Sequence, residues 1–373
     1  MNIGYDASRA FIGNRTGTEN YSFQILKNLI QIDQSNKYYI YLRQLASSQS
    51  VALSTQGDAL NNNLKFIPIP FPRLWTQAGL AKQTFKDHLD VLFIPAHTIP
   101  LIRRPGLKTV VTVHDLGAEF LPKTHQIKQR LYLNLMTHHQ LKSATHIITV
   151  SKATKEDLIK RVGIPEKKIT VVYEGYNKEL FKPQKGDTLN ITLKQFGLKN
   201  QEYFLFVGTI QPRKNLARLI EAFAALNNPP KLILAGSKGW LSDEIYELPK
   251  KLGIEDSVKF LGYVPDEKLP ALYSGAKAFL FPSLFEGFGL PVLEAMACGC
   301  PVLTSNISSL PEVAGKAAIL VNPYSVEEIA QGIEEIKTQD TRNKLIKSGF
   351  EHVKKFSWEK AARETLLVLE KFS

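Results

Sequence analysis

The chain lacks the features that mark secreted, disulfide-bonded and membrane-spanning proteins. It has 373 residues and only two cysteines, Cys298 and Cys300, whose C-x-C spacing suits neither a zinc framework nor a mutual disulfide. Small buried thiols in a reducing compartment are the simpler interpretation. Residues 1–9 carry no apolar signal segment, and no window holds the roughly 20 apolar residues of a membrane span. We therefore expect a cytoplasmic protein that could lie on the inner face of the cell membrane as a peripheral protein.

Negative charge is scarce in the first half of the chain. Residues 1–185 contain 25 Lys and Arg against 13 Asp and Glu, whereas residues 186–373 contain 22 of each, so the whole net charge of +12 falls in the first half. Such asymmetry suggests an anionic partner for that half: an anionic bilayer, a lipid-linked phosphate or nucleic acid. A merely soluble basic surface is the alternative, because net charge affects solubility first.

The pattern of apolar runs predicts an α/β protein with two domains. The length exceeds what one hydrophobic core usually serves, and short apolar runs alternate with helical spacing in both halves. This predicts two doubly wound, Rossmann-like parallel sheets in tandem, facing a central cleft. The expected strands are residues 38–42, 91–96, 109–115, 146–151 and 169–175 in the first half, and 203–208, 231–236, 258–264, 276–283, 301–305 and 317–321 in the second. The expected domains are 1–185 and 186–355, followed by a helix at 356–373.

The segment 282–302, PSLFEGFGLPVLEAMACGCPV, combines a strand end, a glycine-rich loop and a helix start. Free backbone N–H groups at a helix start bind anions, and glycine lets the backbone approach a phosphate. Glu286 precedes the helix and Glu294 lies within it, so one carboxylate could bind sugar hydroxyls and the other a ribose diol. Taken alone, Glu294 could also be a solvated residue on the helix surface.

Two cations follow the next strand end, in VGTIQPRKNLARLIEAF (207–223). Arg213 and Lys214 stand just before a helix for which Asn215 is the expected cap, and they could clamp a diphosphate and neutralise charge on a departing one. An ordinary solvated pair of charges is the alternative.

Two positions in the first half are candidates for the same cleft. Gly17, in TGTENYSFQIL (16–26), opens a helix and could approach a diphosphate, although a simple capping turn would look the same. His114 follows the apolar strand 109–113 and could bind a sugar hydroxyl or act on an acceptor proton, unless it is a structural histidine.

In this order, the segments resemble the retaining glycosyltransferases of family 4, which have the GT-B fold, and in particular the bacterial mannosyltransferase-like group 1 enzymes. The resemblance covers essentially the whole chain and is strongest over residues 203–323. Its specific signature is the E-x7-E pair, Glu286 to Glu294, accompanied by VGTIQPRKN, FLGYVPDEKLPALYSGAKAFLFPS and LPEVAG.

The resemblance implies roles for residues of the second domain. Glu294 should bind the donor ribose, and Glu286 should bind the transferred hexose near the anomeric centre. Backbone N–H groups should be offered to the sugar and phosphates by Phe288, Gly289 and Leu290.

The remaining implied roles concern the diphosphate, the base and the first domain. Arg213 and Lys214 should hold the diphosphate, and Tyr263 should line the base pocket. Gly17 should lie by the diphosphate and His114 by the sugar. The last helix, around Trp358, should cross back to the first domain.

The chain departs from many relatives in two places. Thr209 follows the strand-ending Gly208 where an Arg is common, so the clamp would rest on Arg213 and Lys214 alone, and one glycine stands at position 17 where some relatives have two. The G-T-I-x-P-R-K-N version is similar to that of mannosyl- or rhamnosyltransferases of surface polysaccharide. GDP-mannose is therefore the leading donor.

The resemblance implies a reaction and its components. A hexose would pass from a nucleoside diphosphate to a glycan or lipid-linked acceptor hydroxyl with retention, in cell-surface polysaccharide or glycolipid synthesis. No D-x-D sequence occurs, so no metal or other cofactor is expected. The alternatives are a GT-B epimerase or phosphorylase, a catalytically idle GT-B scaffold, and a basic nucleic-acid-binding protein. No nucleic-acid motif appears, and no nucleic-acid partner is expected.

Overall fold

The computed structural model describes most of the chain: residues 1–12, 17–43, 63–71, 73–96, 98–116 and 138–372. These residues form two compact units, one made of residues 1–175 with 358–373 and the other of residues 176–357. In the described part of the chain, no helix is both long enough and apolar enough to cross a bilayer.

The first unit ends at Gly175, whereas the sequence analysis placed the division after Lys185. The intervening segment packs on the second unit: the Phe181 ring lies 6.2 Å from that of Tyr273, and the Gln184 amide donates to Ser274 at 2.9 Å. These contacts assign residues 176–185 to the second core.

The first unit contains a seven-stranded parallel sheet with the order β3-β2-β1-β4-β5-β6-β7. Its strands are β1 (Asn2–Asp6), β2 (Lys37–Leu42), β3 (Leu64–Pro68), β4 (Val91–Ile94), β5 (Lys108–Val113), β6 (His146–Thr149) and β7 (Ile169–Val171). The order runs outward in both directions from β1 and β4, which is the doubly wound arrangement.

Two of these strands were not predicted from the sequence. β1 is central in the sheet, yet its five residues include Gly4 and end in Asp6, so no apolar run marks it. Gly4 is required by packing, because a Cβ there would lie 2.7 Å from Leu89 Cδ1. β3 is partly exposed along its length, so its sequence does not form a continuous apolar run either.

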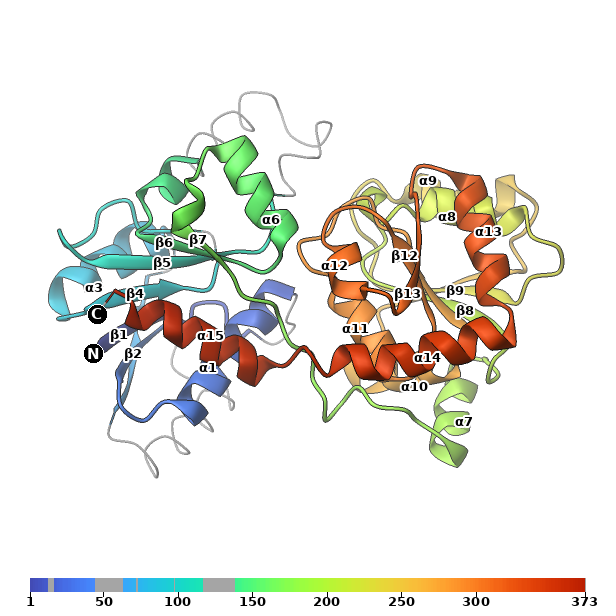
Figure 1. Ribbon diagram of the computed structural model, residues 1–373, viewed down its shortest axis with the longest axis horizontal. Coiled ribbons are helices and arrows are strands. Elements are labelled where there is room, and N and C mark those ends of the chain that lie inside the picture. Colours follow the sequence, from blue (N-terminus) through green and yellow to red (C-terminus); the bar gives the residue numbers. More distant parts are fainter. Residues whose placement is uncertain (13–16, 44–62, 72, 97, 117–137, 373) are drawn as a thin grey trace. The chain divides into compact units, whose positions relative to one another are not determined.

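Helices cover both faces of the first sheet (Figure 1). They are α1 (Gly17–Ile32), α3 (Ala81–Lys86), α6 (Lys152–Asp157) and α15 (Trp358–Glu370), with π-helical turns at Trp75–Leu80 and Leu158–Val162 and a 3-10 turn at Glu166–Lys168. Ser151 caps α6, accepting a hydrogen bond from the Thr154 amide at 3.0 Å. α15 lies alongside α1, with the rings of Trp358 and Tyr21 5.9 Å apart (Figure 1).

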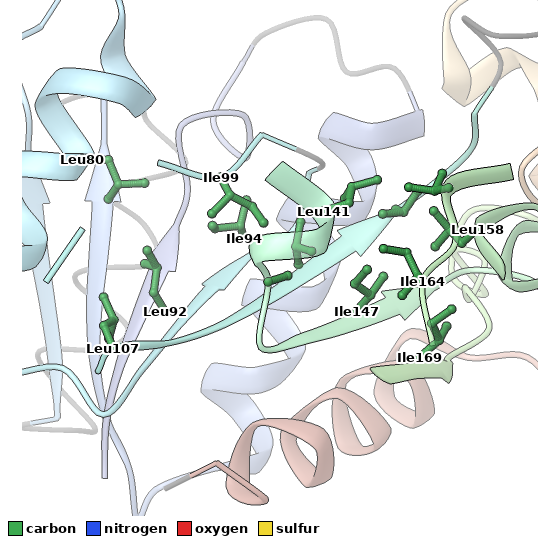
Figure 2. Close-up of a cluster of buried hydrophobic side chains, with 14 of the residues drawn as sticks. Leu80, Leu92, Ile94, Ile99, Leu107, Leu141, Ile147, Leu158, Ile164 and Ile169 are labelled. Carbon is green, nitrogen blue, oxygen red and sulfur yellow. The ribbon is translucent and has the colours of Figure 1, made fainter. Parts of the chain in front are cut away.

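The core on one face of this sheet is mostly aliphatic (Figure 2), and the buried Tyr41 and Trp75 also belong to it. Leu92 and Ile94 of β4 point to this face together with Ile147 of β6, and Leu80 and Leu158 cover them from the helical turns. Phe93, between Leu92 and Ile94, is also fully buried and lies against Tyr5 on the opposite face. Burial on both faces explains why the central strands are apolar throughout.

The second unit contains a six-stranded parallel sheet with the order β10-β9-β8-β11-β12-β13. Its strands are β8 (Tyr203–Val207), β9 (Lys231–Ala235), β10 (Val258–Gly262), β11 (Ala278–Phe281), β12 (Val302–Ser305) and β13 (Ala318–Val321). Its helices are α7 (Gly186–Gln195), α8 (Leu216–Ala224), α9 (Asp243–Lys251), α10 (Leu269–Gly275), α11 (Leu290–Ala297), α12 (Leu310–Ala314), α13 (Val326–Ile336) and α14 (Gln339–Val353), with 3-10 turns at Pro212–Lys214 and Asp266–Lys268. All six predicted strands are present, and no strand end differs from its prediction by more than two residues.

The two cysteines lie at the end of α11 and are buried, free thiols, as predicted. Burial raises the pKa of both Cys298 and Cys300, so neither is a reactive thiolate. Gly299 between them has φ +75°, which ends the helix and turns the chain toward β12.

Candidate functional site

The order of strands in the second sheet reverses between β8 and β11. In open parallel sheets, ligands bind beyond the carboxyl ends of the strands at such a switch point. The loop after β8 carries Arg213 and Lys214, and the loop after β11 carries Glu286. The two loops are joined there by a backbone hydrogen bond of 2.9 Å from the Leu284 amide to the Arg213 carbonyl.

Glu286 forms ion pairs with both predicted clamp residues. Lys214 Nζ lies 2.7 Å from Glu286 Oε1, and Arg213 Nη1 lies 2.8 Å from Oε2. Arg213 Nη1 also donates to the Phe285 carbonyl at 2.6 Å. The sequence analysis treated the clamp and the sugar-binding carboxylate as separate features, and the structure joins them in one cluster, called here the ion triad.

The ion triad is largely removed from solvent. Glu286 is 7% exposed and Lys214 8%, and Lys214 Nζ also lies 4.8 Å from the centre of the Phe281 ring. Burial alone would raise the pKa of Glu286, but the charges of Lys214 and Arg213 outweigh it and hold the pKa below its ordinary value. The carboxyl group is therefore ionised at neutral pH.

Two serines that the sequence analysis did not select hold the loop after β11 from the other side. Ser309 Oγ donates to the carbonyls of Glu286 and Phe288, at 2.9 and 2.7 Å. Ser308 Oγ accepts from the Glu286 amide at 3.2 Å and donates to its carbonyl at 2.7 Å. Both follow β12, 22 and 23 residues after Glu286, and no local pattern in the sequence marks them.

The predicted glycine-rich segment, residues 286–289, is here called the donor loop. Gly289 has φ +114°, and an added Cβ would lie 2.9 Å from Leu310 Cδ2, so this position needs glycine for both conformation and space. Phe288 is buried with its ring 6.0 Å from that of Phe356, and Leu290 begins α11. The donor loop therefore leads directly into a helix N-terminus, as predicted.

Glu294 lies in the middle of α11, on the same segment as the donor loop. Burial raises its pKa to about 8, and the charge of Asp266 adds to this, while a hydrogen bond of 3.2 Å from the Tyr273 hydroxyl acts in the opposite direction. The two glutamates of the E-x7-E pair thus differ: Glu286 is paired and ionised, and Glu294 has no cationic partner among the groups that shift its pKa.

Asn215 occupies the predicted cap position of α8, but its side chain makes no cap hydrogen bond. Its amide instead donates to the carbonyls of Pro282 and Pro323, at 3.0 and 2.6 Å. The residue itself has φ +60°. Asn215 thus ties the turn that carries Arg213 and Lys214 to two other loops, a role that spacing along the chain could not reveal.

The neighbouring loops after β8 and β9 touch through their backbones. Gly236 has φ +155°, and a Cβ there would lie 1.9 Å from the Gly208 carbonyl oxygen. Thr209, where the resemblance led us to expect an arginine, follows this contact and is exposed. Tyr263 directly follows β10 and is 64% exposed, so its ring is open to contact with a ligand.

The two candidates of the first unit have different surroundings. His114 follows β5, with Nδ1 3.3 Å from Glu174 Oε1 and Nε2 2.9 Å from the Pro95 carbonyl oxygen. Burial lowers its pKa, but the charge and hydrogen bond of Glu174 and the Pro95 carbonyl outweigh this and raise the pKa above its ordinary value. Gly17 is the first residue of α1, and a Cβ there would meet nothing within 4 Å. Glu174 and Pro95 were not selected from the sequence.

Seven of the predicted site residues therefore lie on the loops and helix around one switch point of the second unit. They are Arg213, Lys214, Glu286, Phe288, Gly289, Leu290 and Glu294. Tyr263 lies at the carboxyl end of β10 in the same sheet. His114 lies at the carboxyl end of β5 and Gly17 at the start of α1, both in the first unit.

Comparison with known proteins finds glycosyltransferase families along most of the chain. Residues 191–352 match the family described as Glycosyl transferases group 1, and residues 44–180 match Glycosyltransferase Family 4. O-antigen chain mannosyltransferase B of Escherichia coli is 35% identical over 264 residues, which cover 69% of each protein.

Solved structures agree with the fold. Sucrose-phosphate synthase from Thermosynechococcus elongatus covers 99% of this chain and 98% of its own, with a TM-score of 0.77 at 20% identity. Anabaena HepE, solved in complex with UDP-glucose, covers 100% of both chains, with a TM-score of 0.75 at 20% identity. With two doubly wound sheets, matches to both family descriptions and 35% identity to a mannosyltransferase, the chain belongs to the group 1 glycosyltransferases of family 4, which have the GT-B fold.

Proposed function

We propose that this glycosyltransferase moves a hexose from a nucleoside diphosphate to an acceptor hydroxyl with retention and without a metal ion. The observation that carries the proposal is the ion triad of Arg213, Lys214 and Glu286 beside the start of α11, at the switch point of the second sheet. The triad keeps one net positive charge, and together with a helix N-terminus it provides fixed positive potential where a diphosphate would bear charge. The carboxylate keeps that cluster ordered and offers acceptor oxygens to sugar hydroxyls.

The donor would lie along α11. Glu294 would accept hydrogen bonds from the ribose diol, and the donor loop would offer its backbone to the phosphates and hexose. Tyr263, exposed beyond β10, would contact the base. An ionised Glu294 is the better acceptor, and its pKa of about 8 means that binding the ribose is coupled to loss of a proton.

In the transfer step, the bond between the anomeric carbon and the diphosphate oxygen breaks, and the acceptor oxygen bonds to that carbon from the same face. The acceptor proton passes to the leaving diphosphate, and the products are a glycoside and a nucleoside diphosphate. Arg213 and Lys214 would stabilise the charge on the leaving group. His114 and Gly17 are proposed to contact the sugar and diphosphate from the first domain.

Mannose is the leading sugar and GDP-mannose the leading donor. The support is the E. coli relative, whose name describes an O-antigen chain mannosyltransferase. HepE was solved with UDP-glucose, so the experiment below compares guanosine and uridine nucleotides as the donor base. The acceptor is proposed to be a glycan or a lipid-linked sugar of cell-surface polysaccharide or glycolipid synthesis.

Peripheral attachment to an anionic membrane is part of the proposal. The first unit exposes four apolar side chains around the π-helical turn 75–80: Phe71 at 45%, Leu74 at 72%, Leu101 at 37% and Ile102 at 71%. These four side chains are called here the apolar patch. Gln77 joins its segments, because its side chain donates to the Ile99 carbonyl and accepts from the Leu101 amide, both at 2.9 Å.

The charge around the apolar patch suits anionic lipid headgroups. Arg73 and Lys82 are both exposed and border the patch along the chain. Phe71 packs over Gly79, where an added Cβ would lie 3.1 Å from Phe71 Cβ, so the ring is held at the surface. Apolar side chains flanked by cations are the composition of an interfacial anchor.

The proposed function is tested by thermal-shift titration with GDP, UDP, ADP and their sugar derivatives, with and without EDTA, since a ligand that binds only the folded state raises the melting temperature. A shift with one nucleotide that EDTA leaves unchanged supports a metal-free site, and NMR of the transferred product reports retention. If no nucleotide shifts the protein, transferase activity is refuted in favour of an idle scaffold. Salt-sensitive binding of RNA or DNA would then favour the nucleic-acid alternative.

A further inference from the structure

A closed ring of contacts runs behind the donor loop and returns to it. It begins at Ser309, fully buried at the start of α12, whose hydroxyl donates to the Phe288 carbonyl at 2.7 Å. At the other end of α12, the Val313 carbonyl lies 2.8 Å from His352 Nε2. The short helix α12 is therefore held at both ends, by the donor loop and by α14.

The ring of contacts closes through two aromatic side chains. The centre of the His352 ring lies 5.5 Å from that of Phe356, and the Phe356 ring lies 6.0 Å from that of Phe288 in an edge-to-face arrangement. Phe356 and Phe288 are both 4% exposed. Aromatic pairs at these separations attract one another beyond the effect of the area they bury.

Two glycines make this arrangement tight. Gly315 has φ +56°, and a Cβ there would lie 2.5 Å from His352 Cε1, so the imidazole fits against bare backbone at the end of α12. Gly289, in the donor loop, leaves similar room for Leu310 at the start of α12. The first contact holds α12 closely against α14, and the second holds it closely against the donor loop.

We propose that His352 and Phe356 are positioning residues for the donor loop, acting through α12 and through the Phe288 ring. Neither belongs to the ion triad or to the E-x7-E pair. Held from Ser309 on one side and from Phe356 on the other, residues 286–289 keep one conformation before a donor arrives. The inference rests on the proposed function only in that this loop contacts the phosphates and hexose.

The contacts that His352 and Phe356 make behind the donor loop, called here the brace, should affect some ligands more than others. The ribose carboxylate Glu294 lies in α11, outside the ring of contacts, whereas the donor loop is part of it. Loss of the brace should weaken binding of a sugar nucleotide about tenfold, because more than one hydrogen bond to the loop would be disordered. Binding of the nucleoside monophosphate, which does not reach the loop, should change by less than about twofold.

The first experiment needs no donor. Hydrogen exchange of the unliganded protein is followed in peptides that cover residues 285–293, for Phe356→Leu and for the matched control Phe223→Leu. Phe223 is equally buried, in α8 of the same unit. Faster exchange in this peptide with Phe356→Leu, but not with the control at equal loss of overall stability, supports the brace. Unchanged exchange in 285–293 overturns it, whatever the protein binds.

A second pair of variants tests the His352 hydrogen bond. His352→Gln keeps an N–H donor for the Val313 carbonyl, whereas His352→Leu removes it. We expect faster exchange in 285–293 and a raised KM for the donor with Leu, and partial recovery of both with Gln. Equal values for the two variants would overturn the role of the hydrogen bond. If His352→Leu changes exchange in 285–293 but wild-type protein binds no sugar nucleotide, the brace stands and the proposed function fails.

Discussion

Lys214 and Glu286 are 72 residues apart in the chain, yet Lys214 Nζ lies 2.7 Å from Glu286 Oε1 in a site almost closed to solvent. The cation expected to hold the donor diphosphate is therefore already neutralised by the carboxylate expected to hold the hexose. A donor would bind to a preassembled cluster rather than to two separate charges. Such preorganisation avoids reorganisation during the reaction.

Removing the Glu286 carboxylate should lower both activity and stability, and a second substitution should distinguish the two effects. Glu286→Gln should lower kcat/KM by about 100-fold or more, because a group near the anomeric centre is lost. It should also destabilise the fold by about 3–5 kcal/mol, because Lys214 is left buried without a full counter-charge. Adding Lys214→Met to Glu286→Gln should restore much of the stability and none of the activity. Urea unfolding and donor kinetics of wild type, the two single variants and the double variant measure both effects.

A surface pair provides the control for this cycle. Lys354 and Glu351 also form an ion pair of 2.7 Å, but both side chains are about two-thirds exposed. The same double-mutant cycle there should give a coupling energy of at most about 1 kcal/mol. A coupling between Lys214 and Glu286 no larger than this would contradict the buried ion triad.

Glu294 should make stability depend on pH. Its pKa is about 8 in the folded protein and ordinary in the unfolded chain, so the folded state holds an extra proton between about pH 4.5 and 8. The contribution of this group to stability therefore falls as pH rises through that range, by at most about 1.4 kcal/mol per pH unit. Glu294→Gln cannot lose the proton, so it should gain stability relative to wild type between pH 5.5 and 8.5.

Chemical unfolding at three pH values in that range measures the difference. A constant difference between wild type and Glu294→Gln would mean that the carboxyl group has an ordinary pKa. Nucleotide affinity offers a second readout, since the ionised carboxylate is the better acceptor for a ribose diol. It should rise with pH in wild type and stay flat in Glu294→Gln.

The Ser309 hydroxyl should influence the KM for the donor through its hydrogen bonds to the donor loop. Ser309→Ala removes the hydroxyl that donates to the carbonyls of Glu286 and Phe288, and should cost about 1–3 kcal/mol of stability and raise the KM for the donor. Ser305→Ala is the matched control, because Ser305 is equally buried and donates to the Ser283 carbonyl at 2.6 Å, before the donor loop begins. Equal KM values in the two variants would show that Ser309 acts on the fold alone.

We expect the first unit to bind anionic membranes through the apolar patch. Leu74→Ser with Ile102→Ser should reduce sedimentation with anionic vesicles about tenfold or more, since two exposed aliphatic side chains lose the chance of burial. Ile191→Ser is the control, because Ile191 is 61% exposed but lies in the second unit. Binding that is equal for anionic and neutral vesicles, or unchanged by the double substitution, would refute attachment through this surface.

Much of the second unit could be predicted from the chain alone. Its strands are short apolar runs, several of them ended by a glycine, because a parallel strand buried on both faces must be apolar throughout. The helix start that was predicted within residues 282–302 lies at Leu290, with Pro291 in the first turn and Gly299 just beyond the end, where proline and glycine are favoured. Alternation of these elements was enough to predict a doubly wound sheet, to place Glu286, Arg213 and Lys214 on the loops that follow its strands, and to place Glu294 in the helix after one of them.

Tertiary structure alone decided the rest. β1 carries no apolar pattern and becomes the centre of its sheet only because β2 and β4 pair with it on either side. Ser309, Asn215 and Phe356 act on loops between about 20 and 110 residues away, at distances set by the order of the strands. Periodicity along a chain reports which face of an element is buried, but not which loops meet at the edge of a sheet. The sequence alone therefore predicted the family, both doubly wound sheets and a set of candidate site residues, and the tertiary structure decided that three of those residues form one buried ion triad.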